Sequence, residues 1–160
     1  MQGRVRRIVV GVHGSPGSLR ALRRGVAEAR AHDAELVSVL AWRPVEGDMV
    51  HRPGVDRYLR ELRECSAWQR LTKSWDDAFG GVPPDIDARP VVVRAPAGPA
   101  LVDIAADGEG DLLVVGAGRP NRLRRALIRS VPRYCAARAC CPVLVVPPSP
   151  LTRERTLTRP

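Results

Sequence analysis

Residues 111–118 have the sequence DLLVVGAG, which predicts the centre of the fold. Its short, continuously apolar run from Asp111 to Val115 is typical of a strand that is covered on both faces of a sheet. Gly116 and Gly118 follow directly, and glycine at a strand end lets a ligand approach the backbone closely. We therefore expect a central strand that ends at a binding crevice.

Strand-like and helix-like segments alternate on both sides of this stretch. Strands are predicted at residues 5–12, 35–42, 86–94, 111–115 and 142–146. Helices are predicted from Ser15-Pro16 onward, over residues 55–79, 99–107 and 121–128, and from Ser130 onward, because a hydroxyl cap followed by proline starts a helix well. The alternation predicts an α/β fold with a five-stranded, parallel, doubly wound sheet.

The longest predicted helix, residues 55–79, carries an apolar stripe along its whole length. Its members are Leu62, Cys65, Trp68, Leu71, Trp75 and Phe79. Helical spacing of this kind is typical of a face packed on the core, so we expect these aromatic side chains to be core residues.

The length and composition limit the classes of protein to which this chain can belong. The chain has 160 residues, of which 44% are hydrophobic, enough for one domain with its own core. No apolar run approaches the roughly 18–20 residues that span a bilayer, and the apolar run near the start is too short for a signal peptide. We expect one domain over residues 1–147, a flexible tail over 148–160, no membrane contact and a cytoplasmic location.

Cysteine and histidine spacing argues against a metal site. The four cysteines, Cys65, Cys135, Cys140 and Cys141, form no CxxC pair, and the three histidines are far from them in sequence. We expect reduced, mostly buried thiols that pack as small apolar groups.

The formal net charge is +9, almost all of it from arginine. Between Leu112 and Arg153 there is no acidic residue, while several arginines lie there. Such a run is either a solvated face or a surface for nucleic acid. We expect at most weak, nonspecific binding of nucleic acid.

Two glycine-bearing strand ends, residues 11–14 and 116–118, point to one ligand crevice. Ligands of doubly wound sheets bind at the carboxyl ends of the strands, where the strand order reverses. The two loops face each other if the first and fourth strands are neighbours. Ser130 then either only caps the last helix or belongs to an anion site at that helix N-terminus.

The ordered segments of this chain resemble the universal stress protein family. They are RRIVVGVHGSPGSLRAL at residues 6–22, LAWRP at 40–44, RPVVVRAPAGPALVDIA at 89–105, DLLVVGAG at 111–118 and LRRALIRSVPRYCAARACCPVLVVPP at 123–148. The resemblance implies an adenine-nucleotide-hydrolase-like fold with strand order 3-2-1-4-5. It also implies a cytoplasmic stress-response role, usually without a known catalytic reaction, and commonly a homodimer.

The resemblance also implies candidate nucleotide-binding residues. ATP-binding members carry a glycine motif whose ends match Gly116 and Ser130, while Arg119 and Arg129 stand at its inner glycines and Gly118 is one place early. The family's nucleoside-holding aspartate falls on His13. The candidate set is Val12, His13, Ala41, Val115, Gly116, Gly118, Arg119, Arg129 and Ser130.

Three departures from the motif bear on ATP. Arg119 and Arg129 either fill the phosphate space or grip phosphate by charge, because guanidinium suits phosphate oxygens. His13 removes a carboxylate acceptor, although neutral imidazole still accepts one hydrogen bond. We expect an adenine-nucleotide-type crevice in which ATP binding is weak, altered or absent, and no metal except Mg²⁺ accompanying ATP.

Three functions stay open at this point. The leading one is a regulatory stress-response module. The alternatives are a nucleotide-handling enzyme with weak hydrolysis, or a basic module that binds nucleic acid or an acidic protein partner. Ser15, Ser130 and His13 could converge, but no Gly-x-Ser-x-Gly elbow is present, and we predict no catalytic residue.

A homodimer is expected through the last predicted strand. Val143, Leu144, Val145 and Val146 form a flat apolar run between Pro142 and Pro147. An unpaired edge of this kind invites a second chain, and the resemblance implies pairing across the last strand.

Overall fold

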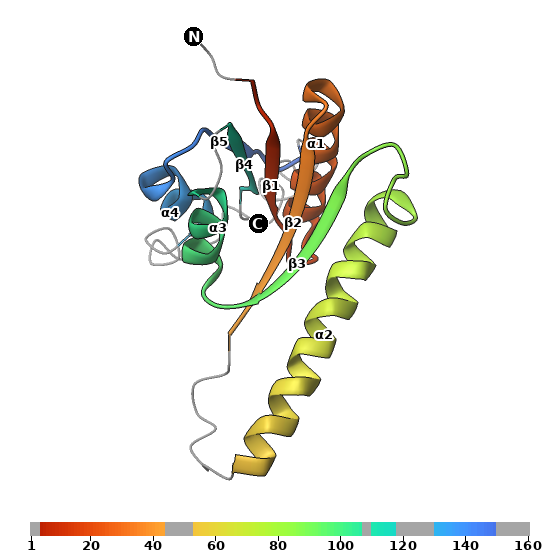
Figure 1. The fold of residues 1–160 in the computed structure, drawn as a ribbon, viewed down its shortest axis with the longest axis vertical. Coiled ribbons are helices and arrows are strands. Elements are labelled where there is room, and N and C mark those ends of the chain that lie inside the picture. Colours follow the sequence, from red (N-terminus) through yellow and green to blue (C-terminus); the bar gives the residue numbers. More distant parts are fainter. Residues whose placement is uncertain (1–3, 44–52, 107–109, 118–129, 150–160) are drawn as a thin grey trace, which may run out of the picture.

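The computed structural model describes residues 4–43, 53–106, 110–117 and 130–149. Five parallel strands form one sheet in the order β3-β2-β1-β4-β5, which confirms the predicted fold class and strand order. The elements are β1 (Arg7–Gly11), α1 (Pro16–His32), β2 (Glu35–Trp42), α2 (Pro53–Phe79), β3 (Ala88–Arg94), α3 (Ala97–Ala106), β4 (Asp111–Gly116), α4 (Val131–Arg138) and β5 (Val143–Val146) (Figure 1).

Helices cover both faces of the sheet, and the alternation of side chains along each strand explains how. Ile8 and Val10 of β1 belong to one buried cluster together with residues of α1 and α2. Val9 belongs to a second cluster together with residues of α3 and α4. The central strands are mostly apolar because each face of the sheet meets a helical layer, and the buried Ser38 of β2 is hydrogen-bonded to Trp75.

The predicted boundaries are close to the observed ones. β2 spans the predicted residues, and Ser15 caps α1 with its side chain, as the Ser15-Pro16 pair indicates. α3 begins two residues before its predicted start. The predicted helix at 121–128 and most of the predicted tail lie outside the described residues.

The expectation that the whole stripe of α2 is core is correct only for Leu71 and Trp75, and it is wrong for Leu62, Cys65, Trp68 and Phe79. Leu71 and Trp75 are buried, and the Trp75 indole Nε1 donates to Ser38 Oγ at 3.2 Å. Leu62 is 48% exposed, Trp68 is 40% exposed and Phe79, the last residue of α2, is 36% exposed. The N-terminal half of α2, which includes Leu62, extends past the sheet and so does not pack on it (Figure 1).

The expectation of mostly buried thiols is also only partly correct. All four cysteines are free, but Cys65 and Cys140 are exposed, Cys141 is half-buried and only Cys135 is fully buried. Cys65 is exposed for the same reason as Leu62, because it lies on the half of α2 that extends past the sheet.

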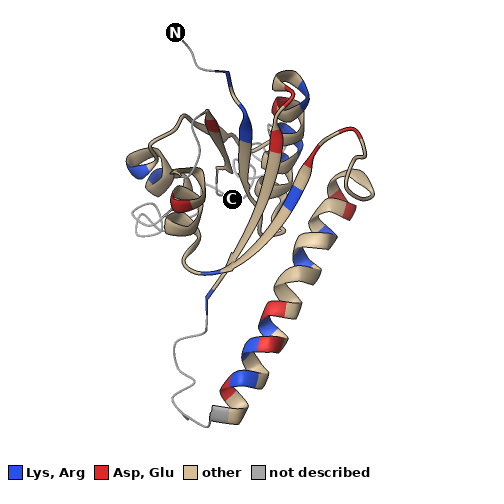
Figure 2. Cartoon of the chain, viewed as in Figure 1, with Lys and Arg blue, Asp and Glu red and all other residues tan. Residues whose placement is uncertain are grey.

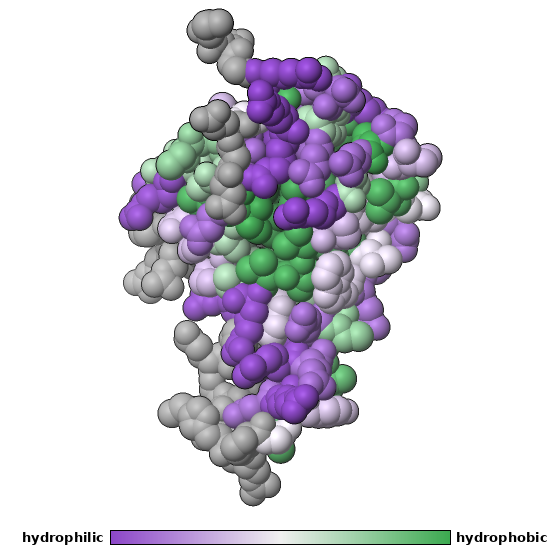
Figure 3. All heavy atoms as spheres, in the orientation of Figure 1, coloured by the Kyte–Doolittle hydropathy of each residue, from purple (hydrophilic) through white to green (hydrophobic). Residues whose placement is uncertain are grey.

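The surface is polar around a more apolar centre. Acidic and basic side chains alternate along α2, where Arg57 pairs with Glu61 and Lys73 with Asp77 (Figure 2). Hydrophobic residues gather at the middle of the face shown in Figure 3, where β2 and β3 lie in Figure 1, with hydrophilic residues around them.

Within the described ranges, none of the helices is both long enough and apolar enough to span a bilayer.

Candidate functional site

A cavity of about 230 Å³ lies at the carboxyl ends of β1 and β4. The chain builds the sheet outward from β1 in one direction through β2 and β3, and then in the other direction through β4 and β5, so the strand order reverses between β1 and β4. Open α/β sheets bind their ligands at this point. The lining residues are Gly11, Val12, His13, Ser15, Gly17, Ser18, Val39, Ala41, Ala97, Leu101, Val115, Gly116, Ala117, Ser130, Val131 and Pro132.

The loop between β1 and α1 forms a compact hydrogen-bonded turn on one side of the cavity. Ser15 Oγ accepts from the Ser18 amide at 3.2 Å, and Ser18 Oγ donates to the Ser15 carbonyl at 3.0 Å. The His13 amide donates to Ser18 Oγ at 3.3 Å. His13 Nε2 lies 3.2 Å from Ser15 Oγ. The turn therefore holds an imidazole and a hydroxyl together at the cavity wall.

The end of β4 lies directly against the first turn of α1. A Cβ at Gly116 would collide with the Gly17 carbonyl, and a Cβ at Gly17 would lie 3.1 Å from the Ala117 carbonyl oxygen. Only glycine at position 116 allows this approach, which closes the cavity between the two loops.

Ser130 occupies the N-cap position of α4, but its side chain makes no cap hydrogen bond. The Ser130 residue lines the cavity together with Val131 and Pro132 of the first turn. Helix capping by the hydroxyl therefore does not explain Ser130. The first turn of α4 faces the cavity, and a helix N-terminus favours negative charge.

The opposite wall of the cavity is apolar. Val39 and Ala41 of β2, Leu101 of α3 and Val115 of β4 line it. Gly11 keeps the space open, since a Cβ there would lie 2.9 Å from Leu101 Cδ1. The cavity thus joins an apolar slot to a polar end that carries hydroxyls and an imidazole.

The structure brings six of the nine predicted site residues to this cavity. These are Val12, His13, Ala41, Val115, Gly116 and Ser130. Gly118, Arg119 and Arg129 lie outside the described residues. Sequence reasoning missed Val39, Ala97 and Leu101 as lining residues. Val39 had a usable signal, because it lies two places before Ala41 on the same strand face.

Within the described ranges, no group of three or more histidine, cysteine, aspartate or glutamate side chains is placed to hold a metal ion. None of the lining residues that the structure describes carries a carboxylate or a thiol. The residues that the structure describes at the cavity can therefore contact a ligand through hydroxyls, an imidazole, backbone groups and apolar surface.

Comparison with known proteins agrees with this arrangement. The sequence profile of the universal stress protein family matches residues 4–147. Universal stress protein Rv2624c of Mycobacterium tuberculosis is 32% identical over 141 residues, which cover 87% of this chain and 47% of that protein. The chain thus spans about half the length of that relative.

A shorter relative and a solved structure match over nearly their full length. Universal stress protein Rv1636 of Mycobacterium tuberculosis is 31% identical over 140 residues, covering 87% of this chain and 94% of that protein. A crystal structure of a universal stress protein in complex with cAMP superposes with a TM-score of 0.65 and 30% identity, covering 90% of this chain and 98% of the other. By profile, sequence and fold together, this chain belongs to the universal stress protein family.

Proposed function

We propose that this protein is a regulatory stress-response module that binds an adenine nucleotide in the cavity between β1 and β4. The observation that carries the proposal is the mixed lining of that cavity. Its apolar residues, among them Ala41 and Leu101, suit a flat base. Its polar end, at His13 and Ser130, suits ribose hydroxyls and phosphate.

The size of the cavity favours a small nucleotide. Its volume of about 230 Å³ is below the roughly 300–1,000 Å³ that is common for ligand pockets, so a nucleoside monophosphate suits it better than a dinucleotide. The similar structure solved with cAMP supports the same class of ligand. ATP, with Mg²⁺, is the extended alternative.

Calorimetric titration with cAMP, AMP and ATP, the last with and without Mg²⁺, tests the proposal. The decisive variant is Ala41→Phe, which adds an aromatic ring inside the apolar slot. Its control is Ala137→Phe, which adds the same ring on the exposed face of α4. We expect the parent and the control to bind a monophosphate and Ala41→Phe to lose binding by at least tenfold. Failure of the parent protein to bind any of these nucleotides would overturn the proposal.

Self-association through β5 is part of the proposed function. β5 pairs with β4 on one side, and within the described ranges no strand pairs with its other edge. Val145 is 40% exposed on this strand. A second copy could extend or cover this edge in an isologous contact.

Light scattering on a sizing column tests the dimer. The parent should elute at about twice 17.4 kDa, and Val145→Arg should shift it to the monomer. Val82→Arg, which changes an equally exposed valine outside β5, is the matched control and should remain dimeric. A parent protein that is monomeric at micromolar concentration would contradict this part of the proposal.

The proposed location is the cytoplasm. All four cysteines are free, and free thiols are the usual state in reducing compartments. Cell fractionation with a tagged full-length chain checks the location.

A further inference from the structure

Among the described residues that line the cavity, His13 has the one ionisable side chain. Its imidazole becomes positively charged when it takes up a proton. The described groups next to this end are Ser15 and Ser18 from the start of α1, and Ala117 and Ser130 from the side of β4 and α4. The Arg20 guanidinium of α1 also lies close to Gly17 and has a fixed positive charge. None of these described residues is acidic.

The hydrogen bonds of Ser15 couple its hydroxyl to the charge of His13. Ser15 Oγ accepts from the Ser18 amide at 3.2 Å and lies 3.2 Å from His13 Nε2. In the neutral tautomer that carries its proton on Nδ1, Nε2 accepts a hydrogen bond from the Ser15 hydroxyl, so the hydroxyl proton is occupied. With protonated imidazole, Nε2–H donates to Ser15 Oγ, and the hydroxyl proton becomes free to bond elsewhere.

We infer that His13 and Ser15 together determine the charge specificity of this cavity, and that they select an anionic nucleotide over a neutral nucleoside by taking up a proton. The inference rests on the proposed nucleotide site. It adds the reason why a ligand with phosphate is preferred and the condition under which the preference is strongest.

Protonation of His13 has two effects, and both raise the affinity of the cavity for an anionic ligand. The imidazolium adds a positive charge at the cavity wall, and the freed Ser15 hydroxyl adds a donor that can reach an anion. Hydrogen bonds in which one partner is charged are stronger than neutral ones. A neutral nucleoside gains little from either change, so its affinity should not follow the protonation of His13.

Titration with cAMP and with adenosine between pH 5.5 and 8.5 tests the inference. cAMP is a useful probe because its phosphodiester stays singly charged throughout this range, while adenosine lacks the phosphate. For the parent we expect cAMP affinity to rise about tenfold from pH 8.5 to 5.5, a typical size for coupling between two bound ligands. Adenosine affinity should stay within a factor of two.

Three variants test whether His13 and Ser15 cause the pH dependence of cAMP affinity. His13→Gln keeps a hydrogen-bonding side chain but cannot titrate, so its cAMP affinity should not change with pH. Ser15→Ala keeps the imidazole but removes the hydroxyl, so the pH dependence should shrink. His32→Gln changes the half-buried histidine at the other end of α1, away from the cavity, and should keep the full dependence of the parent.

Proton uptake gives an independent measurement. Calorimetry of cAMP binding near pH 7 in two buffers of different ionisation enthalpy should show net proton uptake by the parent and none by His13→Gln. Equal pH dependence for cAMP and adenosine, or an unchanged dependence in His13→Gln, would overturn this inference and leave the proposed site intact. Failure of both ligands to bind at every pH would overturn both.

Discussion

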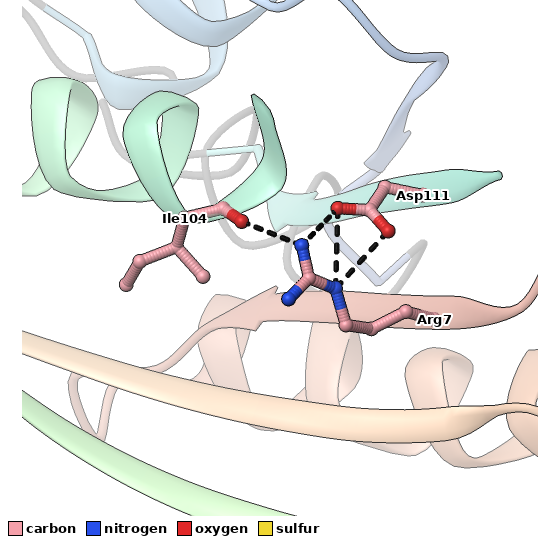
Figure 4. A network of polar contacts seen from close by, with 3 residues as sticks. All are labelled: Arg7, Ile104 and Asp111. Carbon is pink, nitrogen blue, oxygen red and sulfur yellow. Dashed lines mark hydrogen bonds and ion pairs between the residues drawn. The ribbon is translucent and has the colours of Figure 1, made fainter. Parts of the chain in front are cut away.

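Arg7 and Asp111 form an ion pair at the amino ends of β1 and β4, at the opposite end of the sheet from the cavity (Figure 4). Arg7 Nε donates to Asp111 Oδ1 at 3.0 Å, and a terminal nitrogen of Arg7 donates to the Ile104 carbonyl at 2.8 Å. The Asp111 residue is 3% exposed. One guanidinium therefore joins two neighbouring strands to the end of α3.

Removing one partner of this pair should destabilise the protein strongly. We expect Asp111→Ala to lower the free energy of unfolding by about 3–5 kcal/mol, because it removes the buried carboxylate that accepts the hydrogen bonds of the Arg7 guanidinium. The double variant Arg7→Met with Asp111→Leu should recover much of that loss. Urea denaturation measures both. A loss below about 1 kcal/mol in Asp111→Ala would show that the pair contributes little.

The close approach of β4 and α1 makes Gly116 sensitive to any side chain. We expect Gly116→Ala to cost about 1–3 kcal/mol of unfolding free energy, because the added methyl group meets the Gly17 backbone. Gly54→Ala is the matched control, since a Cβ there has open space around it. Within α2 that change should be neutral or stabilising by up to about 1 kcal/mol. Equal effects in chemical denaturation would argue against the close approach.

The two halves of α2 should respond differently to the same substitution. Leu71 is 1% exposed, so Leu71→Ala should cost about 2–5 kcal/mol through lost burial and a cavity. Leu62 is 48% exposed, so Leu62→Ala should change the unfolding free energy by less than about 1 kcal/mol. Thermal and urea unfolding of the two variants compares them directly. A large loss in Leu62→Ala would mean that another surface covers this half of the helix.

Cys135 should be the least reactive thiol. Burial raises its pKa to about 11 from the model-compound value of 9.0, and neighbouring Cys141 adds to the shift. Since only the thiolate reacts, iodoacetamide at pH 8 should label exposed Cys65 and Cys140 and leave Cys135 unlabelled in the folded protein. Peptide mass spectrometry measures the labelling. Labelling of Cys135 at the rate of Cys65 would contradict its burial.

The same thiol predicts a pH dependence of stability. The folded protein holds the Cys135 proton more tightly than the unfolded chain does, so this contribution is complete below about pH 9 and is lost as the pH rises toward about 11. The unfolding free energy of the parent should therefore fall more steeply over this range than that of Cys135→Ala. Parallel curves for the two proteins would mean that Cys135 does not contribute.

Binding of nucleic acid should be weak and depend on salt. Arg133 and Arg138 are exposed on α4, and Arg138 lies 5.7 Å from the ring centroid of Tyr134. Each phosphate contact on duplex DNA contributes a slope of about −0.9 to the logarithm of affinity against the logarithm of salt concentration. Arg133→Ala should reduce the magnitude of this slope by about 0.9, the contribution of one phosphate contact. Arg57→Ala on α2 should leave the slope unchanged. Tight binding at physiological salt in fluorescence anisotropy would favour a dedicated nucleic-acid module.

Local sequence determined the elements of this fold and the end of the sheet at which the cavity lies. Mostly apolar runs such as Glu35–Trp42 indicated their strands almost to the residue, because strands covered on both faces of a sheet have mainly apolar side chains. Ser15 before Pro16 marked the start of α1. His13 and Gly116 were identifiable as site candidates because both lie at strand ends, where doubly wound sheets bind ligands.

The tertiary structure alone decided which of those residues meet. The apolar stripe of α2 has the same periodicity along its whole length, and that periodicity does not determine which part of the helix packs on the sheet. In the structure Leu71 is buried, while Leu62 is exposed. The ion pair of Arg7 and Asp111 joins residues 104 positions apart, and it depends on the register of β1 with β4. The contact between His13 and Ser15 depends on how the turn before α1 folds back on itself. Contacts of these three kinds arise from the relative placement of elements, which local propensity does not encode.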